Sequence, residues 1–431
     1  MYRRPVAYRE RFLPHCEILA HSSGRTIIIV PTSILHHRVC DARFVMANIL
    51  IFTSQVYRLG GVEGLSIRLA LDIAKQAAMN VHVVVMAPLN HSGDIATLRE
   101  LEGAGVRVTS LNRKPRSGIW TAVRSVVRLR RILSTETYVA IETGLLGTSA
   151  IASLASLGLS VTHIVGVHAP YRKAWHKGIK YLLWRWALRL NRRNVYYGVS
   201  KAVAADWARY LPTSCDKIHM IPNCTSPRSL VVDTDIKAWL GLDPSTRLVL
   251  SIGRLTVSKG YHVAYAALKP LLVSMNLALV FLGARELEGL CGDDGKMLAD
   301  VEADIGAEGL GNRVKFVGWQ NDIWPFLKGA DLLVHVPLRE GFGLVLVEAM
   351  EAGVPLITTA VDGIPEVLGD VPSPLIAAND VAGLRDAIQA VLSWPANTTS
   401  NWRAKAETRV RCFSPQQRMT NMLALVKRGV V

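Results

Sequence analysis

The segment "REGFGLVLVEAMEAGVP", residues 339–355, decides how the rest of the chain is interpreted. It places a loop with two glycines, Gly341 and Gly343, directly before an apolar run of helical length. A loop of this kind presents unpaired backbone N–H groups and the positive end of the helix dipole, which together bind anions. Glu340 precedes the glycines and Glu348 lies within the apolar run. The segment therefore predicts an anion site, although an ordinary strand–loop–helix connection would have a similar sequence.

Short apolar runs alternate with longer helical stretches on both sides of this segment. Apolar, β-branched runs bounded by turn residues indicate strands buried on both faces, and helical crossovers between them imply parallel sheets. A polar stretch, residues 222–244, separates two such series, so we expect an α/β protein with two doubly wound domains facing each other across a cleft. The strands are expected at residues 48–53, 81–86, 106–110, 138–141, 163–167, 195–199 and 219–221, and then at 247–252, 277–282, 314–317, 332–336, 356–359 and 375–376.

This pattern divides the chain into four segments. Residues 46–222 and 223–409 are expected to form the N-terminal and C-terminal Rossmann-like domains. Residues 410–431 are expected to hold a last helix that could pack back on the N-terminal domain. Residues 1–45 differ in composition, and we expect a poorly ordered extension, or an upstream start, whose removal leaves folding and activity intact.

The net charge of +16 is concentrated in one half of the chain. Residues 46–222 hold 23 basic and 9 acidic residues, with no acidic residue between Glu142 and Asp206. The positive electrostatic field of such a domain suits an anionic partner: a membrane surface, a phosphorylated acceptor or nucleic acid. No nucleic-acid-binding motif is present. Residues 120–133 and 171–193 mix basic and aromatic residues as membrane-surface helices do, although a solvated basic face over an aromatic core would look alike.

Cysteine usage and hydropathy bear on location. None of the six cysteines forms a CxxC pair, so neither a zinc site nor a disulfide framework is indicated. The most apolar stretch, residues 144–169, is rich in Gly, Ser and Ala and is interpreted as a helix plus a buried strand rather than a membrane span. We expect a cytoplasmic protein, with peripheral binding at the inner membrane face as a further expectation.

Three other elements carry candidate site residues. Arg254 and Lys259 follow the strand at 247–252, and they can reach the anion site if that strand neighbours the one at 332–336. The glycine pair that ends at Gly61 permits close approach of the backbone to a ligand. His168 follows a buried strand and could serve as a general base or an electrostatic partner. Each signal alone also fits an ordinary turn, a solvated cation or a structural histidine, and neither the GxGxxG nor the P-loop pattern is present.

Taken in order, these motifs resemble the retaining glycosyltransferases of the GT-B fold, specifically glycosyltransferase family 4. The resemblance runs from about residue 46 to the C-terminus, and its most specific part is the pair Glu340 and Glu348. Cys224, Asp362 and the region of Asp370 and Pro372 depart from the usual glycines of the family, which puts loop details and donor fit in question. The matching motifs are "GGVE", "VH" at His168, "GVSKAV", "IPN", "GRLTVSKG", "FVGW", "EGFGLVLVEAMEAGVPLITT" and "GIPEV".

The resemblance implies a specific reaction and a role for each site residue. Family members transfer a sugar from a nucleotide-diphosphate sugar with retention at the anomeric carbon, to a saccharide or lipid-linked acceptor in cell-surface polysaccharide or glycolipid synthesis. His168 would lie beside the transferred sugar and Glu340 would hold its hydroxyls, while Glu348 would bind the ribose. The diphosphate would be held by Arg254 and Lys259 above Gly61, and by the loop and helix start formed by Gly341, Phe342, Gly343, Leu344 and Val345.

The resemblance also implies that neither a cofactor nor a metal is used. The triplet "DTD", residues 233–235, has the form of a metal-binding motif but lies in the linker and is interpreted as solvated. Two other functions remain open: a nucleotide-sugar epimerase or phosphorylase of the same fold, and a non-catalytic binding subunit. An epimerase is not expected to carry the pair Glu340 and Glu348. A non-catalytic subunit does not need these two glutamates together with Arg254 and Lys259.

Overall fold

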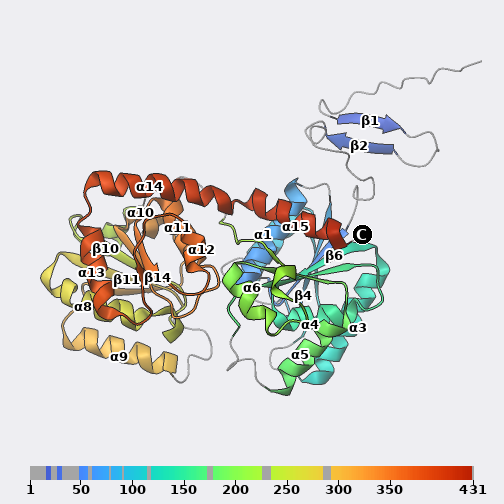
Figure 1. Ribbon diagram of the computed structural model, residues 1–431, viewed down its shortest axis with the longest axis horizontal. Coiled ribbons are helices and arrows are strands. Elements are labelled where there is room, and N and C mark those ends of the chain that lie inside the picture. Colours follow the sequence, from blue (N-terminus) through green and yellow to red (C-terminus); the bar gives the residue numbers. More distant parts are fainter. Residues whose placement is uncertain are drawn as a thin grey trace, which may run out of the picture.

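Two parallel β-sheets form the framework of the protein, one in each half of the chain (Figure 1). The computed structural model describes residues 16–20, 27–31, 48–56, 61–76, 79–89, 92–113, 118–171, 178–225, 234–284 and 293–429. The strands β1 (Cys16–Ala20) and β2 (Ile27–Pro31) pair antiparallel. Most of residues 1–45 lie outside the described residues, and so does the expectation that this segment is a poorly ordered extension.

The N-terminal sheet has seven strands in the order β5-β4-β3-β6-β7-β8-β9, and all neighbouring strands run parallel. Its strands are β3 (Asn48–Thr53), β4 (Asn80–Val85), β5 (Arg107–Ser110), β6 (Tyr138–Thr143), β7 (Thr162–Val167), β8 (Asn194–Gly198) and β9 (Ile218–Met220). Its helices are α1 (Gly61–Gln76), α2 (Ser92–Gly103), α3 (Ile119–Thr135), α4 (Leu146–Ala155), α5 (Ile179–Leu190) and α6 (Lys201–Ala208), with a 3₁₀ turn at Cys215–Lys217.

The C-terminal sheet has six strands in the order β12-β11-β10-β13-β14-β15, again all parallel. Its strands are β10 (Arg247–Ile252), β11 (Leu277–Leu282), β12 (Val314–Gly318), β13 (Leu332–His335), β14 (Leu356–Thr359) and β15 (Leu375–Ile376). The helices are α7 (Ile236–Trp239), α8 (Tyr261–Ser274), α9 (Asp293–Ala307), α10 (Trp324–Gly329), α11 (Leu344–Ala352), α12 (Ile364–Leu368), α13 (Val381–Leu392), α14 (Ala396–Val410) and α15 (Pro415–Gly429), with 3₁₀ turns at Val257–Lys259 and Arg411–Phe413.

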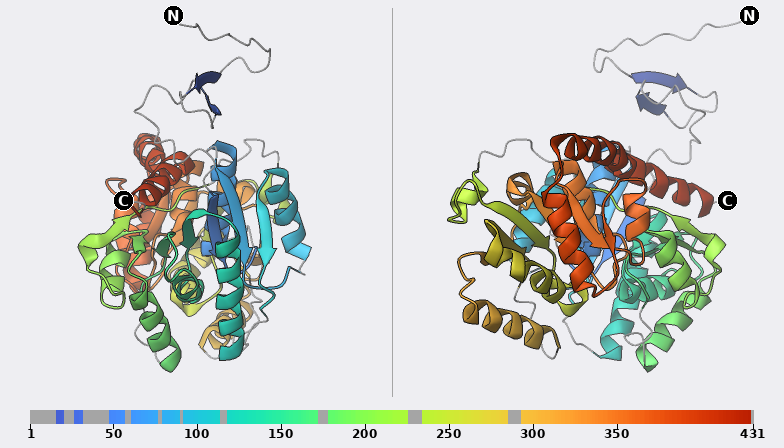
Figure 2. Two further views of the ribbon diagram at one scale, coloured as in Figure 1. Left: turned by 90° about the vertical axis from the view of Figure 1, so that its right-hand side faces the viewer. Right: turned by 60° about the vertical axis from the view of Figure 1, so that its left-hand side comes forward.

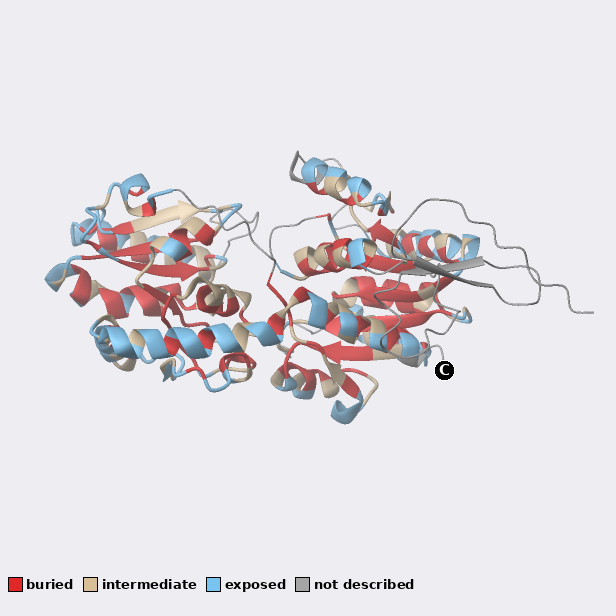
Figure 3. Ribbon diagram, turned by 90° about the horizontal axis from the view of Figure 1, so that it is seen from above, coloured by how far each residue is buried: buried red, intermediate tan, exposed pale blue. Residues whose placement is uncertain are grey.

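The sheets are buried on both faces, as the apolar strands predict. Consecutive residues of β3, from Leu50 to Phe52, are all 0% exposed, although their side chains alternate between the two faces. Separate clusters of buried side chains cover the two faces of each sheet, and the buried colour follows both sheets in Figure 3. The prediction of two doubly wound parallel sheets is therefore confirmed.

The last two helices connect the halves of the molecule. α14 packs on α11 in the C-terminal half, whereas α15 packs on α1 in the N-terminal half, and both are visible as the red helices crossing the top of Figure 1. Met422, Leu425 and Val426 of α15 belong to the same buried cluster as Ile67 and Ile73 of α1. The right-hand view of Figure 2 shows the same crossing from a further side.

Candidate active site

The predicted site loops follow strands at the point where each sheet reverses its order. In the C-terminal sheet the chain runs outward from β10 to β12 and then continues with β13 on the other side of β10. The N-terminal sheet has the same reversal between β3 and β6. Ligands of doubly wound sheets bind at the carboxyl ends of the strands beside such a reversal. The pairing of β10 with β13 fulfils the condition on which the sequence argument for the two cations depended.

Lys259 and Glu340 form an ion pair at this edge of the C-terminal sheet. The ammonium of Lys259 donates to Oε2 of Glu340, and Nε2 of His335 lies 3.4 Å from the same oxygen. Burial by itself raises the pKa of a carboxyl, but Lys259 and His335 outweigh it and hold the pKa of Glu340 well below its usual range. Glu340 is therefore ionised at neutral pH and accepts hydrogen bonds only.

The helix after Glu340 begins as the sequence predicts. Gly343 has a φ of 80°, a left-handed conformation that favours glycine, and it precedes α11 without a side-chain cap. The first N–H groups of α11, at Leu344 and Val345, therefore lie at an uncapped helix start. Phe342 is buried against Phe413, with ring centroids 5.3 Å apart, and this contact anchors the loop. Glu348 is half-buried on α11, one turn beyond the helix start.

His168 meets this loop from the other domain. It directly follows β7, and a Cβ added to Gly341 would lie 2.2 Å from its backbone oxygen. A side chain at position 341 would therefore collide with the backbone of the N-terminal domain. Burial and the charge of Arg418 lower the pKa of His168 to about 3, with an opposing contribution from Asn223, so that the ring is neutral at neutral pH. The structure thus brings His168 and Gly341 together across the two domains.

Several residues without an assigned role hold this contact closed. Ser200 caps α6 and also donates to the backbone oxygen of Gly341 at 2.9 Å. The carboxylate of Glu366, on α12, accepts from the backbone N–H groups of Lys201 and Ala202 at 2.8 and 2.9 Å. Both residues belong to motifs of the sequence resemblance, "GVSKAV" and "GIPEV", which were the only signals for them.

Asp362 has a defined role although it departs from the family pattern. Its carboxylate accepts from Nε of Arg339 at 2.8 Å and from the backbone N–H of Glu340 at 2.9 Å. Arg339 also reaches Asp206 of the N-terminal domain at 3.1 Å. Asp362 has a φ of 43°, which aspartate tolerates better than most residues. It therefore fixes the loop that carries Glu340.

The remaining candidates are Arg254, Gly61 and the "DTD" triplet. Arg254 is exposed, and its backbone oxygen accepts from the N–H of Thr256 at 2.8 Å. Gly61, with a φ of 62°, begins α1, the helix after β3. Residues 57–60 lie outside the described part. Asp235 of the "DTD" triplet caps α7, and Asp233 is not among the described residues. No group of His, Cys, Asp or Glu with metal-site spacing occurs in the described ranges.

Both halves of the chain match families of known proteins. Residues 59–228 match the family described as Glycosyltransferase Family 4, and residues 232–409 match Glycosyl transferases group 1. The chain belongs to the GT-B glycosyltransferases. The two matches together cover most of the sequence, and the family named from the sequence motifs is thereby confirmed.

Curated relatives of this glycosyltransferase are distant and partial. 2-Deoxystreptamine glucosyltransferase of Streptomyces kanamyceticus is 30% identical over 231 residues, which cover 52% of this chain and 57% of the relative. Lipopolysaccharide core biosynthesis mannosyltransferase LpsB of Rhizobium meliloti is 26% identical over 250 residues, covering 51% of this chain and 69% of the relative. Among these and three further relatives, the matched region spans between 40% and 69% of the relative's own length.

Solved structures share the fold over almost the whole chain. HepE of Anabaena, crystallised with UDP and glucose, has a TM-score of 0.71 at 19% identity and covers 89% of this chain and 100% of its own. A glycosyltransferase of Rickettsia africae has a TM-score of 0.73 at 16% identity, with 89% and 99% covered. These likenesses concern the fold alone.

Proposed function

We propose that this chain is a retaining glycosyltransferase that transfers a sugar from a nucleotide-diphosphate sugar to a saccharide or lipid-linked acceptor, in the synthesis of cell-surface polysaccharide or glycolipid. The observation that carries the proposal is the ion pair of Lys259 and Glu340 beside the uncapped start of α11. Membership of the family, the LpsB relative and the UDP and glucose bound to HepE support it.

In the proposed complex the diphosphate binds at the start of α11. The N–H groups of Leu344 and Val345 and the cations of Arg254 and Lys259 compensate its charge, so the proposed site uses no metal. Lys259 contacts the carboxylate of Glu340, and it can therefore orient the group that binds the sugar hydroxyls. Glu348, one helical turn away, binds the ribose hydroxyls.

The proposed transfer exchanges one bond at the anomeric carbon for another on the same face. The bond from this carbon to the phosphate oxygen breaks, and a bond to the acceptor oxygen forms. The acceptor proton passes to the departing diphosphate, so the protein needs no nucleophile of its own. It contributes by orienting the two substrates and by stabilising the negative charge that develops on the diphosphate.

A donor screen tests this function. UDP-, GDP- and ADP-sugars are compared for thermal stabilisation and for slow hydrolysis by the purified protein. We expect one nucleotide class to stabilise the protein, Lys259→Ala and Glu348→Ala to weaken its binding at least tenfold, and Glu340→Ala to reduce turnover more than nucleotide affinity. Lys269→Ala is the matched control, because Lys269 is also ion-paired in the C-terminal half, with Asp304 and Glu308.

Three results would count against the assignment. Stabilisation without hydrolysis or transfer for any donor would favour a binding subunit. Normal turnover in Glu340→Ala would remove the proposed role of that carboxylate, and conversion of the sugar to its epimer would identify the epimerase alternative.

We propose further that the acceptor is met at an anionic membrane surface through α3 and α5. Of the fourteen large apolar side chains that are exposed in the described residues, nine are on these two helices. Trp120 is 77% exposed and Ile179 is 76% exposed. Both helices contact α4, and neither contains an acidic residue. Exposed tryptophans and cations on adjoining helices suit an anionic lipid interface.

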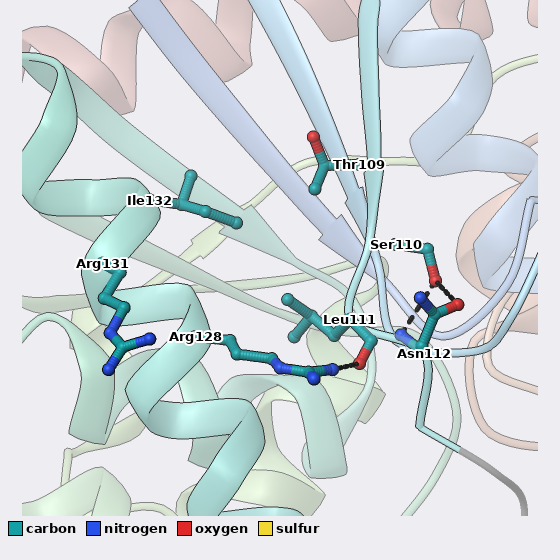
Figure 4. Close-up of a pocket in the computed structure, with 7 residues that line it drawn as sticks. All are labelled: Thr109, Ser110, Leu111, Asn112, Arg128, Arg131 and Ile132. Atoms are coloured by element: carbon teal, nitrogen blue, oxygen red, sulfur yellow. Dashed lines mark hydrogen bonds between the residues drawn. The ribbon is translucent and has the colours of Figure 1, made fainter.

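The position of this surface fits an acceptor at the cleft. α3 and α5 each follow a strand of a parallel sheet, so their N-terminal turns lie at the sheet edge where the cleft is expected. A pocket of about 270 Å³ lies at the same edge, between the end of β5 and α3, and it is lined by Ser110, Asn112, Arg128 and Arg131 among others (Figure 4). Arg128 donates to the backbone oxygen of Leu111 at 2.6 Å, whereas Arg131 is exposed. No helix in the described ranges is long and apolar enough to span a bilayer.

Vesicle sedimentation tests the membrane proposal. We expect the protein to sediment with phosphatidylglycerol vesicles at low salt and to remain in solution with phosphatidylcholine vesicles. Replacing Trp120 and Trp186 by serine should weaken binding at least tenfold, whereas Trp239→Ser, at a similarly exposed tryptophan of the C-terminal half, should not. Equal sedimentation with both lipids, or equal effects of the two sets of variants, would contradict the proposal.

A further inference from the structure

A buried chain of hydrogen bonds connects His168 to the interior of the N-terminal domain. Nε2 of His168 lies 3.0 Å from the hydroxyl of Tyr197, on β8. That hydroxyl donates to Oε1 of Glu142, on β6, at 2.9 Å. Tyr197 is 0% exposed and Glu142 is 2% exposed, so both polar groups depend on partners within the protein.

The direction of these hydrogen bonds determines where the proton of His168 lies. A tyrosine hydroxyl has one proton, and here that proton is donated to Glu142. The oxygen of Tyr197 must therefore accept from Nε2 of His168. Since the ring is neutral, Nδ1 then carries a lone pair. Nδ1 forms no hydrogen bond of ordinary geometry within the described residues, although Asn223 lies close to the ring.

Arg418 supplies the charge that this arrangement needs. It comes from α15, is only 4% exposed, and its Nη2 lies 3.5 Å from the hydroxyl of Tyr197. Its Nη1 donates to the backbone oxygen of Pro222 at 3.0 Å. Burial raises the pKa of Glu142 above its ordinary value, and Tyr197, Arg418 and Ser66 reduce this rise without reversing it. Glu142 accepts from two hydroxyl groups, those of Tyr197 and Ser66, which is the hydrogen-bonding role of a carboxylate.

The neighbouring strand leaves room for this chain of contacts. A Cβ added to Gly166, on β7, would lie 2.4 Å from the hydroxyl of Tyr197. The Tyr197 and His168 rings meet edge to face, with centroids 5.6 Å apart. The position of the hydroxyl is therefore fixed by packing on one side and by hydrogen bonds on the other.

We propose that Tyr197, Glu142 and Arg418 are positioning residues that hold His168 in one orientation and one neutral tautomer, with the proton on Nε2 and the lone pair on Nδ1. The benefit for sugar transfer rests on the proposed function, but the tautomer does not. The C-terminal helix is then a part of the site, because it contributes Arg418.

Long-range ¹H–¹⁵N correlation spectra of the histidine-labelled full-length protein test the tautomer. We expect a single neutral His168 form, protonated at Nε2, with signals assigned by their loss in His168→Gln. Tyr197→Phe should produce a mixture of tautomers. Tyr196→Phe is the matched control, because Tyr196 is the buried neighbour on the same strand and is hydrogen-bonded instead to Asn194. Protonation at Nδ1 in the wild type, or an unchanged tautomer in Tyr197→Phe, would overturn the proposal.

Kinetics give a second readout once a donor is known. Tyr197→Phe should reduce kcat by about tenfold, with the donor KM changed less than threefold, since one hydrogen bond is lost and the substrate contacts remain. Arg418→Met should have a similar effect, and Arg418→Lys should restore part of the activity because it keeps the charge. An inactive wild type would refute the proposed function while the spectra still decide the tautomer. Full activity of Tyr197→Phe would refute the positioning role.

Discussion

Gly341 has no room for a side chain because two domains meet at its Cα. An added Cβ would lie 2.2 Å from the backbone oxygen of His168 and 3.1 Å from its carbonyl carbon. We expect Gly341→Ala to lower the free energy of unfolding by about 1–3 kcal/mol, as overpacking does. It should also reduce turnover at least tenfold, because the loop that carries Glu340 must shift. Urea denaturation and initial rates measure the two effects.

The control for this substitution is Gly311→Ala. An added Cβ at Gly311 meets no atom within 4 Å, and its φ lies outside the left-handed region. Equal effects of the two alanines would mean that the contact with His168 does not restrict the loop.

Sequence reasoning predicted which candidate residues lie near one another better than it predicted their contacts. The pair Lys259 and Glu340 could be expected because both residues follow strands that proved to be neighbours. The role of Asp362 could not, since its partners are fixed by the folded loop. The same limit applies to Tyr197, which a sequence cannot distinguish from its neighbour Tyr196, which is also buried.

At the scale of elements, the contact between α12 and α6 holds the two domains together. The carboxylate of Glu366 binds two backbone N–H groups at the start of α6, where the helix dipole also favours negative charge. We expect Glu366→Ala to weaken domain closure by about 1–2 kcal/mol, a value reduced from that of a buried charged hydrogen bond because Glu366 is half-exposed. Small-angle X-ray scattering should show a larger radius of gyration.

Glu407→Ala provides the comparison. Glu407 forms an exposed ion pair with Arg411 on the C-terminal helical segment, and such a pair contributes little to stability. Its scattering curve should match the wild type. An unchanged radius in Glu366→Ala would show that other contacts close the domains.

Strands and the central helix were predictable because their residues repeat a simple pattern. The predicted ranges 48–53, 247–252, 277–282, 356–359 and 375–376 coincide with β3, β10, β11, β14 and β15, and the apolar run after Gly343 forms α11 as expected. Other strands are displaced by one or two residues at their ends, where backbone pairing rather than hydropathy sets the limit. The contact of Glu366 with Lys201 spans 165 positions, and no local pattern encodes it.

For the molecule as a whole, buried histidines predict sensitivity to acid. Burial lowers the pKa of His82 and of His163 to about 4, from an ordinary value of 6.5. Between these values the unfolded chain binds protons that the folded chain does not, so stability falls as the pH falls. Each group contributes at most about 1.4 kcal/mol per pH unit in this window, and its contribution to stability is fully present above pH 6.5.

Urea denaturation between pH 7.5 and about pH 5 measures this slope. His163→Gln should reduce it by roughly 1 kcal/mol per pH unit while leaving the plateau above the window flat. Glu340 acts in a separate range, since a lowered carboxyl pKa costs stability only below its ordinary value of 4.5. A stability that does not change on acidification to pH 5 would contradict the buried neutral state of both histidines.

The packing of α15 on α1 also sets an order of events during synthesis. The side chains that complete this core, Met422, Leu425 and Val426, are translated after the whole C-terminal domain. Domains generally fold as they emerge from the ribosome, N-terminal first. Here the domain that emerges first must keep the apolar face of α1 uncovered until the last helix arrives. The C-terminal domain can complete its own core earlier. Although it is translated second, we therefore expect it to finish folding first.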